Sequence, residues 1–110
     1  MNIIDLQTVL GEDTRFLSTR PSGREAATTL GVRAAFAGDA MVRFVVPDDM
    51  IEISPSFTLG LFETAVADAG SVDAVLSRLR IQAPRRIVAS MVGALRRGFA
   101  QAQEPQRTYA

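Results

Sequence analysis

Residues 51–62 constrain the fold most, because one short segment changes there from a strand pattern to a helix pattern. Residues 51–53 alternate apolar and polar side chains, as a short strand with one buried face does. Ser54 is a good N-cap, and Pro55 then occupies the first helical position, where its missing N–H costs nothing. The residues that then share one side at helical spacing are Thr58, Phe62, Ala65, Val66 and Ala69. This segment therefore predicts a strand that leads directly into a capped helix.

Ser56 is the second residue of the expected helix, beside free backbone N–H groups and the positive end of the helix dipole. A phosphate on this hydroxyl would place a dianion where anions are stabilised. Ser56 is therefore a candidate phospho-switch. The alternative is that Ser54 and Ser56 both serve only as caps.

Phe57 and Leu61 are neighbours four residues apart that lie off the main apolar stripe of this helix. Two alternatives follow. Either the helix is buried on two sides, or Phe57 and Leu61 form an apolar surface for a protein partner. The second alternative makes both residues candidate partner contacts.

Two motifs resemble those of STAS-like domains, a bacterial family of largely unassigned function. Residues 53–57 and 61–62 are similar to the family's isxSFadeLf signature, and residues 19–25 are similar to its tRxxGRel segment. The resemblance covers about residues 1–100. It implies an α/β sandwich and a regulatory role of the anti-sigma-antagonist type, with a kinase-like or other signalling protein as partner.

The chain differs from true anti-sigma factor antagonists, where the same loop has the sequence Asp-Ser-Ser-Gly. Ser54 stands at the Asp position of that pattern, and Ser56 stands at the phosphorylated Ser. Leu59 and Gly60 stand where the STAS-like family usually has acidic residues. No role of those acidic side chains carries over to this chain.

Composition limits the available chemistry. A chain of 110 residues has room for one domain, and it contains no Cys and no His. Thiolate nucleophiles, imidazole bases and most zinc sites are therefore excluded. Asp48, Asp49 and Glu52 form an acidic cluster, which we interpret as turn chemistry rather than a metal site. We expect no enzymatic activity, no cofactor and no metal, and the absence of a signal peptide or apolar span predicts a cytoplasmic protein.

The remaining elements follow from apolar periodicity and turn residues. We expect strands at residues 2–10, 15–19, 40–46 and 79–82, and helices at residues 22–37, 71–77 and 84–100. The first two strands could pair as a hairpin, and Ser22 with Glu25 has the form of a capping box. Residues 40–46 are almost continuously apolar, as in a central strand that is covered on both faces.

This order predicts an α/β fold. We expect a STAS-like sandwich with a central mixed sheet of about four strands and helices mainly on one face. Residues 1–100 then form a single domain, and residues 101–110 form a disordered polar tail.

Charge is uneven along a chain whose total is zero. Residues 1–77 have a net charge of −6, whereas residues 78–110 have a net charge of +6. The last helix carries the possible basic surface, which consists of Arg85, Arg86, Arg96 and Arg97. These arginines could pair with the acidic first part of the chain, or they could meet nucleic acid, lipid or an acidic protein.

The function that we expect is that of a non-catalytic STAS-like interaction module with a candidate switch at Ser56. Two alternatives stay open. One is a nucleic-acid-binding accessory domain that uses the basic last helix, although nucleic acid is not the favoured partner. The other is a sensor of a small ligand or nucleotide at the helix start near Ser54. No membrane partner is expected, and the sequence leaves the oligomeric state open.

Overall fold

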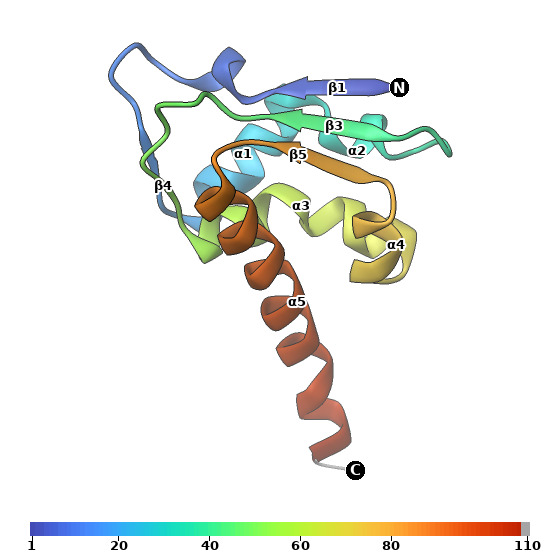
Figure 1. Cartoon of the computed structure of the whole chain (residues 1–110). Coiled ribbons are helices and arrows are strands. Elements are labelled where there is room, and N and C mark those ends of the chain that lie inside the picture. The colour runs from blue at the N-terminus through green and yellow to red at the C-terminus, as the bar shows by residue number, and fades with distance from the viewer. Residues whose placement is uncertain (109–110) are drawn as a thin grey trace.

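Strands and helices alternate in the computed structural model, which describes the backbone of residues 1–108 and the side chains of residues 1–99 (Figure 1). The elements are β1 (Asn2–Asp5), the 3-10 helix η1 (Leu6–Val9), β2 (Phe16–Leu17), α1 (Arg20–Leu30), α2 (Val32–Ala35), β3 (Val42–Val45), β4 (Glu52–Ile53), α3 (Pro55–Ala69), α4 (Val72–Leu76), β5 (Leu79–Gln82) and α5 (Arg85–Thr108). The α/β class is as expected. α5 ends at Thr108 rather than near residue 100. Residues 109–110 lie outside the described part of the chain. The disorder expected for residues 101–110 stays a prediction.

The strands form two separate parallel sheets, and one mixed sheet of about four strands is not seen among the described residues. One sheet has three strands in the order β1-β3-β5, and the other pairs β2 with β4. The expected hairpin between the first two strands is therefore wrong. The carboxylate of Asp5 accepts a hydrogen bond from the N–H of Gln7 and starts η1, so the chain leaves the sheet after Asp5. β2 then meets β4, where the N–H of Ser54 donates to the carbonyl of Leu17.

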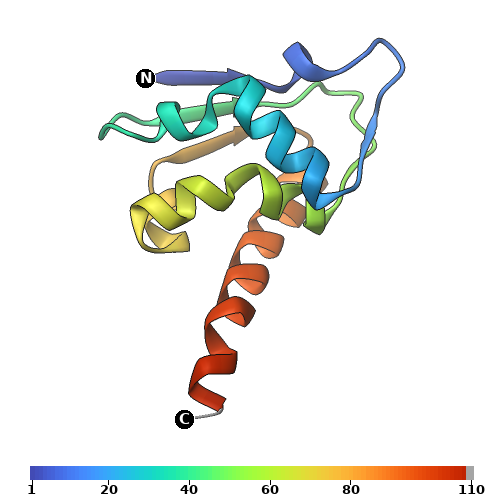
Figure 2. The same cartoon turned by 180° about the vertical axis from the view of Figure 1, so that it is seen from behind.

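Helices cover one face of the three-stranded sheet. The strands lie in front of α1 and α2 in Figure 1 and behind them in Figure 2, which shows the opposite side. Val42 and Phe44 of β3 are buried, whereas Arg43 between them is exposed. The central position expected for residues 40–46 is confirmed, but the expected cover on both faces is wrong. The apolar run is longer than the strand: its first two residues and its last one lie outside β3, and within β3 the buried residues alternate with the exposed Arg43.

The first helix begins and ends earlier than its sequence pattern predicts. Thr19 is the N-cap and accepts a hydrogen bond from the N–H of Ser22, so the expected capping box of Ser22 and Glu25 is not formed. Pro21 fits the first turn of the helix, where no N–H is needed. Gly31 ends α1 in the left-handed conformation, with φ of 68°, which glycine adopts without strain. A short second helix, α2, follows at once.

The core lies between the covered face of the sheet and α3. The ring of Phe62 meets the rings of Phe36 and Phe44 edge to face, with centroids 6.3 and 5.6 Å apart. Phe44 belongs to the central strand, whereas Phe36 follows α2. α3 is thus the helix that joins the sheet to the rest of the core, and its first turn sits at the edge of that core.

Candidate functional site

The start of α3 has the local structure that its sequence predicts. Ser54 is the N-cap, and its Oγ accepts a hydrogen bond from the N–H of Phe57 at 3.1 Å. The same hydroxyl donates to the carbonyl of Ser18 at 2.7 Å, which ties α3 to the segment after β2. Pro55 is the first helical residue, as expected, and Gly70 ends the helix. Ser54 therefore has a structural role that connects two distant segments.

Ser56 is exposed in the first turn of α3, at the second helical position. Within the part of the chain that the structure describes, its hydroxyl makes no hydrogen bond to another side chain or to the backbone. The capping role belongs to Ser54 alone, because the Ser54 oxygen already receives the N–H of Phe57. The side chain of Ser56 is thus free for another reaction or contact.

Phe57 and Leu61 do not form an exposed apolar patch. Phe57 is 1% exposed and Leu61 is 0% exposed. The expectation that they contact a partner is wrong for this fold, because α3 is covered on two sides. Phe62 faces the sheet, whereas Phe57 and Leu61 lie where α1 crosses α3. Of the two alternatives that the pattern left open, burial on two sides is the one the fold adopts.

α1 and α3 approach closely through two glycines. A Cβ on Gly23 would lie 2.2 Å from the carbonyl oxygen of Phe57, and one on Gly60 would lie 2.2 Å from the carbonyl oxygen of Arg20. Such distances are far below van der Waals contact, so only glycine fits at either place. Gly60, which departs from the acidic pattern of the resembled family, therefore has a packing role.

Glu63 joins the two helices by its charge. Its carboxylate accepts hydrogen bonds from Arg20, the shortest at 2.9 Å, and from Arg24, also at 2.9 Å. The hydrogen bond from Arg24, with further contributions from Arg20 and from the positive charges of both arginines, lowers the pKa of Glu63 below its ordinary value, although partial burial opposes this shift. The sequence shows both arginines in one motif, but only the fold reveals their common partner.

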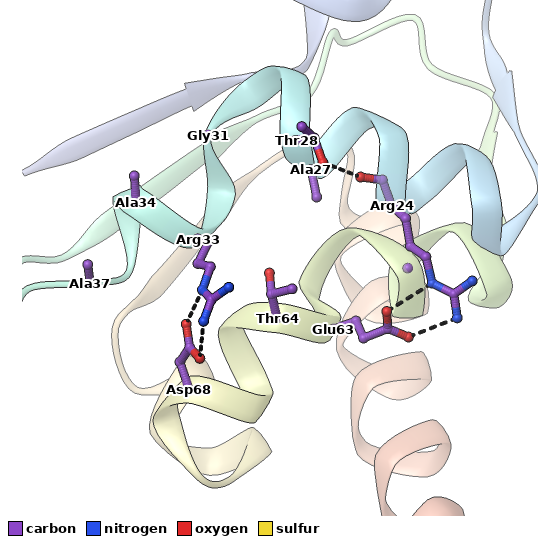
Figure 3. A pocket seen from close by; sticks show the side chains of 11 residues that line it. Arg24, Ala27, Thr28, Gly31, Arg33, Ala34, Ala37, Glu63, Thr64 and Asp68 are labelled. Atoms are coloured by element: carbon purple, nitrogen blue, oxygen red, sulfur yellow. Dashed lines mark hydrogen bonds and ion pairs between the residues drawn. The ribbon is translucent and has the colours of Figure 1, made fainter.

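A groove of about 630 Å³ lies beside this crossing, between α1–α2 and α3 (Figure 3). Arg24 and Glu63 stand at one side, and Arg33 pairs with Asp68 at the other, with a shortest distance of 2.7 Å. Its remaining residues are mostly small: Ala27, Thr28, Gly31, Ala34, Ala37, Gly60 and Thr64. Since each of its two arginines has a carboxylate partner, the groove presents no unbalanced charge to a ligand.

The four arginines of the possible basic surface have different surroundings. Arg86 donates to the backbone carbonyls of Ile51 and Met50, and Arg96 pairs with Asp73 at 3.1 Å. Arg85 and Arg97 are exposed, and neither forms an ion pair within the described residues. Two of the four are therefore engaged within the chain.

Pairing between the acidic and basic parts of the chain is limited. Of five ion pairs within the described residues, the one between Arg96 and Asp73 joins the two parts. Arg78 and Arg86 instead bind backbone carbonyls. The charge asymmetry is thus mostly uncompensated by direct ion pairs in the described chain.

Two exposed apolar side chains near the start of α3 were not singled out by the sequence pattern. Phe16 is 60% exposed and Ile51 is 48% exposed. Phe16 belongs to β2, whereas Ile51 immediately precedes β4, and the N–H of Ile51 donates to the carbonyl of Arg15. The alternation of residues 51–53 groups Ile51 with the buried Ile53 and so predicts burial, and nothing local distinguishes Phe16 from a buried strand residue either.

The described residues contain no group of three or more Asp, Glu, Cys or His side chains that could hold a metal ion. Asp49 of the acidic cluster lies 2.8 Å from the guanidinium of Arg15, and that contact lowers its pKa. No helix within the described range has the length and apolar character that a membrane crossing requires. No family model, curated protein or solved structure matches the chain. The STAS-like relationship is therefore a proposal that rests on the two motifs.

Proposed function

We propose that this chain is a non-catalytic, STAS-like regulatory module that binds a protein partner beside the first turn of α3. The observation that carries the proposal is the free hydroxyl of Ser56, which is exposed at the second helical position while Ser54 supplies the cap. A residue with no structural partner at this place is available for modification. The motifs at residues 19–25 and 53–62 agree with such a role by resemblance.

The partner surface that we propose includes Phe16 and Ile51 in place of the buried Phe57 and Leu61. β4 leads directly through Ser54 into α3, and Ser54 is bonded to the carbonyls of Leu17 and Ser18 at the end of β2, so the ribbon of β2 and β4 lies next to the first turn of α3. Aromatic residues such as Phe16 are enriched in contact surfaces between proteins. A partner that covers this ribbon would lie near Ser56.

A phosphate on Ser56 would add about 1.5–2 negative charges at this contact. Favourable terms at an exposed helix N-terminus amount to only about 0.3–1 kcal/mol, so the fold tolerates the charge with little change. A closely packed partner does not, because an unpaired charge that is buried at an interface costs several kcal/mol. Phosphorylation would then release the partner without unfolding the module.

The two alternatives receive less support from the site. The engagement of Arg86 and Arg96 within the chain weakens the basic surface that a nucleic-acid-binding domain needs. A ligand sensor at the helix start near Ser54 would require convergent unpaired polar groups, but the Ser54 hydroxyl is already bonded to the carbonyl of Ser18 and the N–H of Phe57.

The test uses the partner recovered with the wild-type chain and then purified, so that affinities can be measured. We expect Ser56→Asp to weaken partner binding at least tenfold while the melting temperature stays near that of wild type. Phe16→Ser should weaken binding as well. Mass spectrometry of the chain from its native cells should find phosphate on Ser56.

Thr64→Asp is the matched control, because it adds the same charge at an exposed position two turns further along α3. It should leave partner affinity unchanged. Equal weakening by both Asp variants would point to a nonspecific charge effect, and unfolding of Ser56→Asp would show a structural role for Ser56. Either result contradicts the proposed switch.

A further inference from the structure

The three-stranded parallel sheet has one face that none of the described helices covers. In Figure 1 this face of β1, β3 and β5 is turned toward the viewer, with α1 and α2 behind the strands. Parallel sheets in α/β proteins are almost always covered on both faces. The open face is therefore the feature of this fold that most needs an explanation.

Residues on the open face are apolar and basic rather than uniformly polar. Ile3, Arg43 and Arg80 lie side by side in register on β1, β3 and β5. Ile3 is 65% exposed, and both arginines are also exposed. Two residues further along the strands the next row contains Asp5, Val45 and Gln82.

Arg43 and Arg80 are like charges directly opposite each other, which is an unfavourable pairing across strands. Neither forms an ion pair within the described residues, and Arg80 donates only to the carbonyl of Leu79 beside it. Asp5 is on the same face, but its carboxylate accepts the N–H of Gln7 at the start of η1. The face thus carries two arginines without an ion-pair partner against one carboxylate, so its net charge is positive, and an exposed isoleucine lies beside them.

We propose that this face binds a helix of a partner protein that carries an apolar stripe flanked by Asp or Glu. The apolar stripe would cover Ile3 and Val45, and the carboxylates would neutralise Arg43 and Arg80. A helix is the element that normally covers the second face of a parallel sheet. This surface is separate from the first turn of α3, so the inference stands independently of a switch at Ser56.

Charge complementarity favours this occupant over two others. A second copy stacked through the same face would bring more arginines than acids to the contact, because each copy supplies Arg43 and Arg80 against one carboxylate, Asp5. An anionic lipid surface attracts clusters of basic residues, whereas this face has two arginines and an acid. An acidic helix satisfies both arginines and removes Ile3 from water.

The experiment is a nuclear magnetic resonance titration of the full chain with a designed helical peptide of about 18 residues, or five turns. The peptide presents leucines at helical spacing with glutamates on both sides, and a second peptide has lysine in place of every glutamate. We expect the largest amide shifts at Ile3, Arg43 and Arg80, and no binding of the lysine peptide. Arg43→Glu and Arg80→Glu should each weaken binding at least tenfold.

Arg97→Glu is the matched control, since it reverses an exposed arginine of α5 that no described carboxylate pairs with. It should bind the acidic peptide as wild type does, and so should Ser56→Asp. Melting curves check the fold of each variant. Absent binding, shifts confined to other surfaces, or equal binding of the lysine peptide would overturn the proposal.

Two further measurements test whether a lipid surface or a second copy of the chain binds the open face instead. Binding to phosphatidylglycerol vesicles that Arg43→Glu abolishes would assign the face to lipid. A dimer of the wild-type chain that Arg43→Glu dissociates would assign it to a second copy. Either result contradicts the acidic-helix proposal.

Discussion

Gly23 and Gly60 hold reciprocal positions in the crossing of α1 and α3. Each would place a Cβ 2.2 Å from a carbonyl oxygen of the facing helix, and that oxygen belongs to the residue three positions before the other glycine. Gly23 faces Phe57, and Gly60 faces Arg20. The two contacts therefore belong to one helix crossing, which fixes the N-terminal turns of α1 and α3 relative to each other.

Alanine at either glycine should destabilise the chain. Because the clash is with the backbone of the facing helix, no side chain can rotate away, and overpacking of this kind costs about 1–3 kcal/mol or more. The better helix propensity of alanine, about 1 kcal/mol, offsets part of this loss. Urea denaturation of Gly23→Ala and Gly60→Ala measures the effect.

The double variant tests whether the two contacts share one crossing. Once the helices have moved apart for the first alanine, the second should cost less than it does alone, so the two losses should not add. Additive losses would contradict the reciprocal geometry. Gly38→Ala, at a position with no atom within 4 Å of the added Cβ, is the control.

Glu63 should make the stability of the chain depend on pH. Its folded-state pKa lies below the ordinary value of 4.5, first because Arg24 donates a hydrogen bond to it. The stabilisation is therefore present above the unfolded-state pKa and is lost as the pH falls through the folded-state pKa.

We expect the free energy of unfolding of wild type to exceed that of Glu63→Gln at pH 7, and the difference to shrink below about pH 4.5. Denaturation of both proteins at several pH values measures this difference. Arg15 also lowers the pKa of Asp49, but both proteins contain Asp49, so its contribution cancels when wild type and Glu63→Gln are compared. A difference that does not change with pH would show that Glu63 acts through packing alone.

Ser54 and Ser56 should respond oppositely to substitution. Ser54→Ala loses both the cap on the N–H of Phe57 and the bond to the carbonyl of Ser18, so it should cost about 1–2 kcal/mol. Ser56→Ala should leave the melting temperature within experimental error, because its hydroxyl has no partner in the described chain. Equal destabilisation by both variants would show that Ser56 also serves as a structural cap.

Arg43→Glu should stabilise the isolated chain. It replaces the like-charge pair with Arg80 by an opposite pair, and cross-strand pairs of this kind contribute about 0.2–1 kcal/mol. The same change should weaken binding of an acidic helix to the open face at least tenfold, so that stability and binding move in opposite directions. Thermal melts at low and high salt measure the first effect, and salt should reduce it. A lower melting temperature at low salt would contradict the electrostatic account.

Local signals in the sequence determined the start and end of α3 and the position of β5. Ser54, Pro55 and Gly70 act through bonds within one turn of the helix, so their effect does not depend on the rest of the fold. Asp5 and Thr19 act over the same short range, yet the alternating pattern and the capping-box motif predicted a longer strand and a later helix start there. Two local signals competed at these positions, and the pattern did not show which would prevail.

Only the tertiary structure decided which strands pair, which sides of α3 are buried and which acid meets Arg20 and Arg24. The pairing of β2 with β4, the burial of Phe57 against α1, and the position of Glu63 each join segments more than thirty residues apart. Such contacts depend on where the chain has already placed its other elements, and no periodicity within one segment records that. The open face carrying Arg43 has the same origin, because a residue's neighbours across a sheet are set by strand order rather than by its own strand.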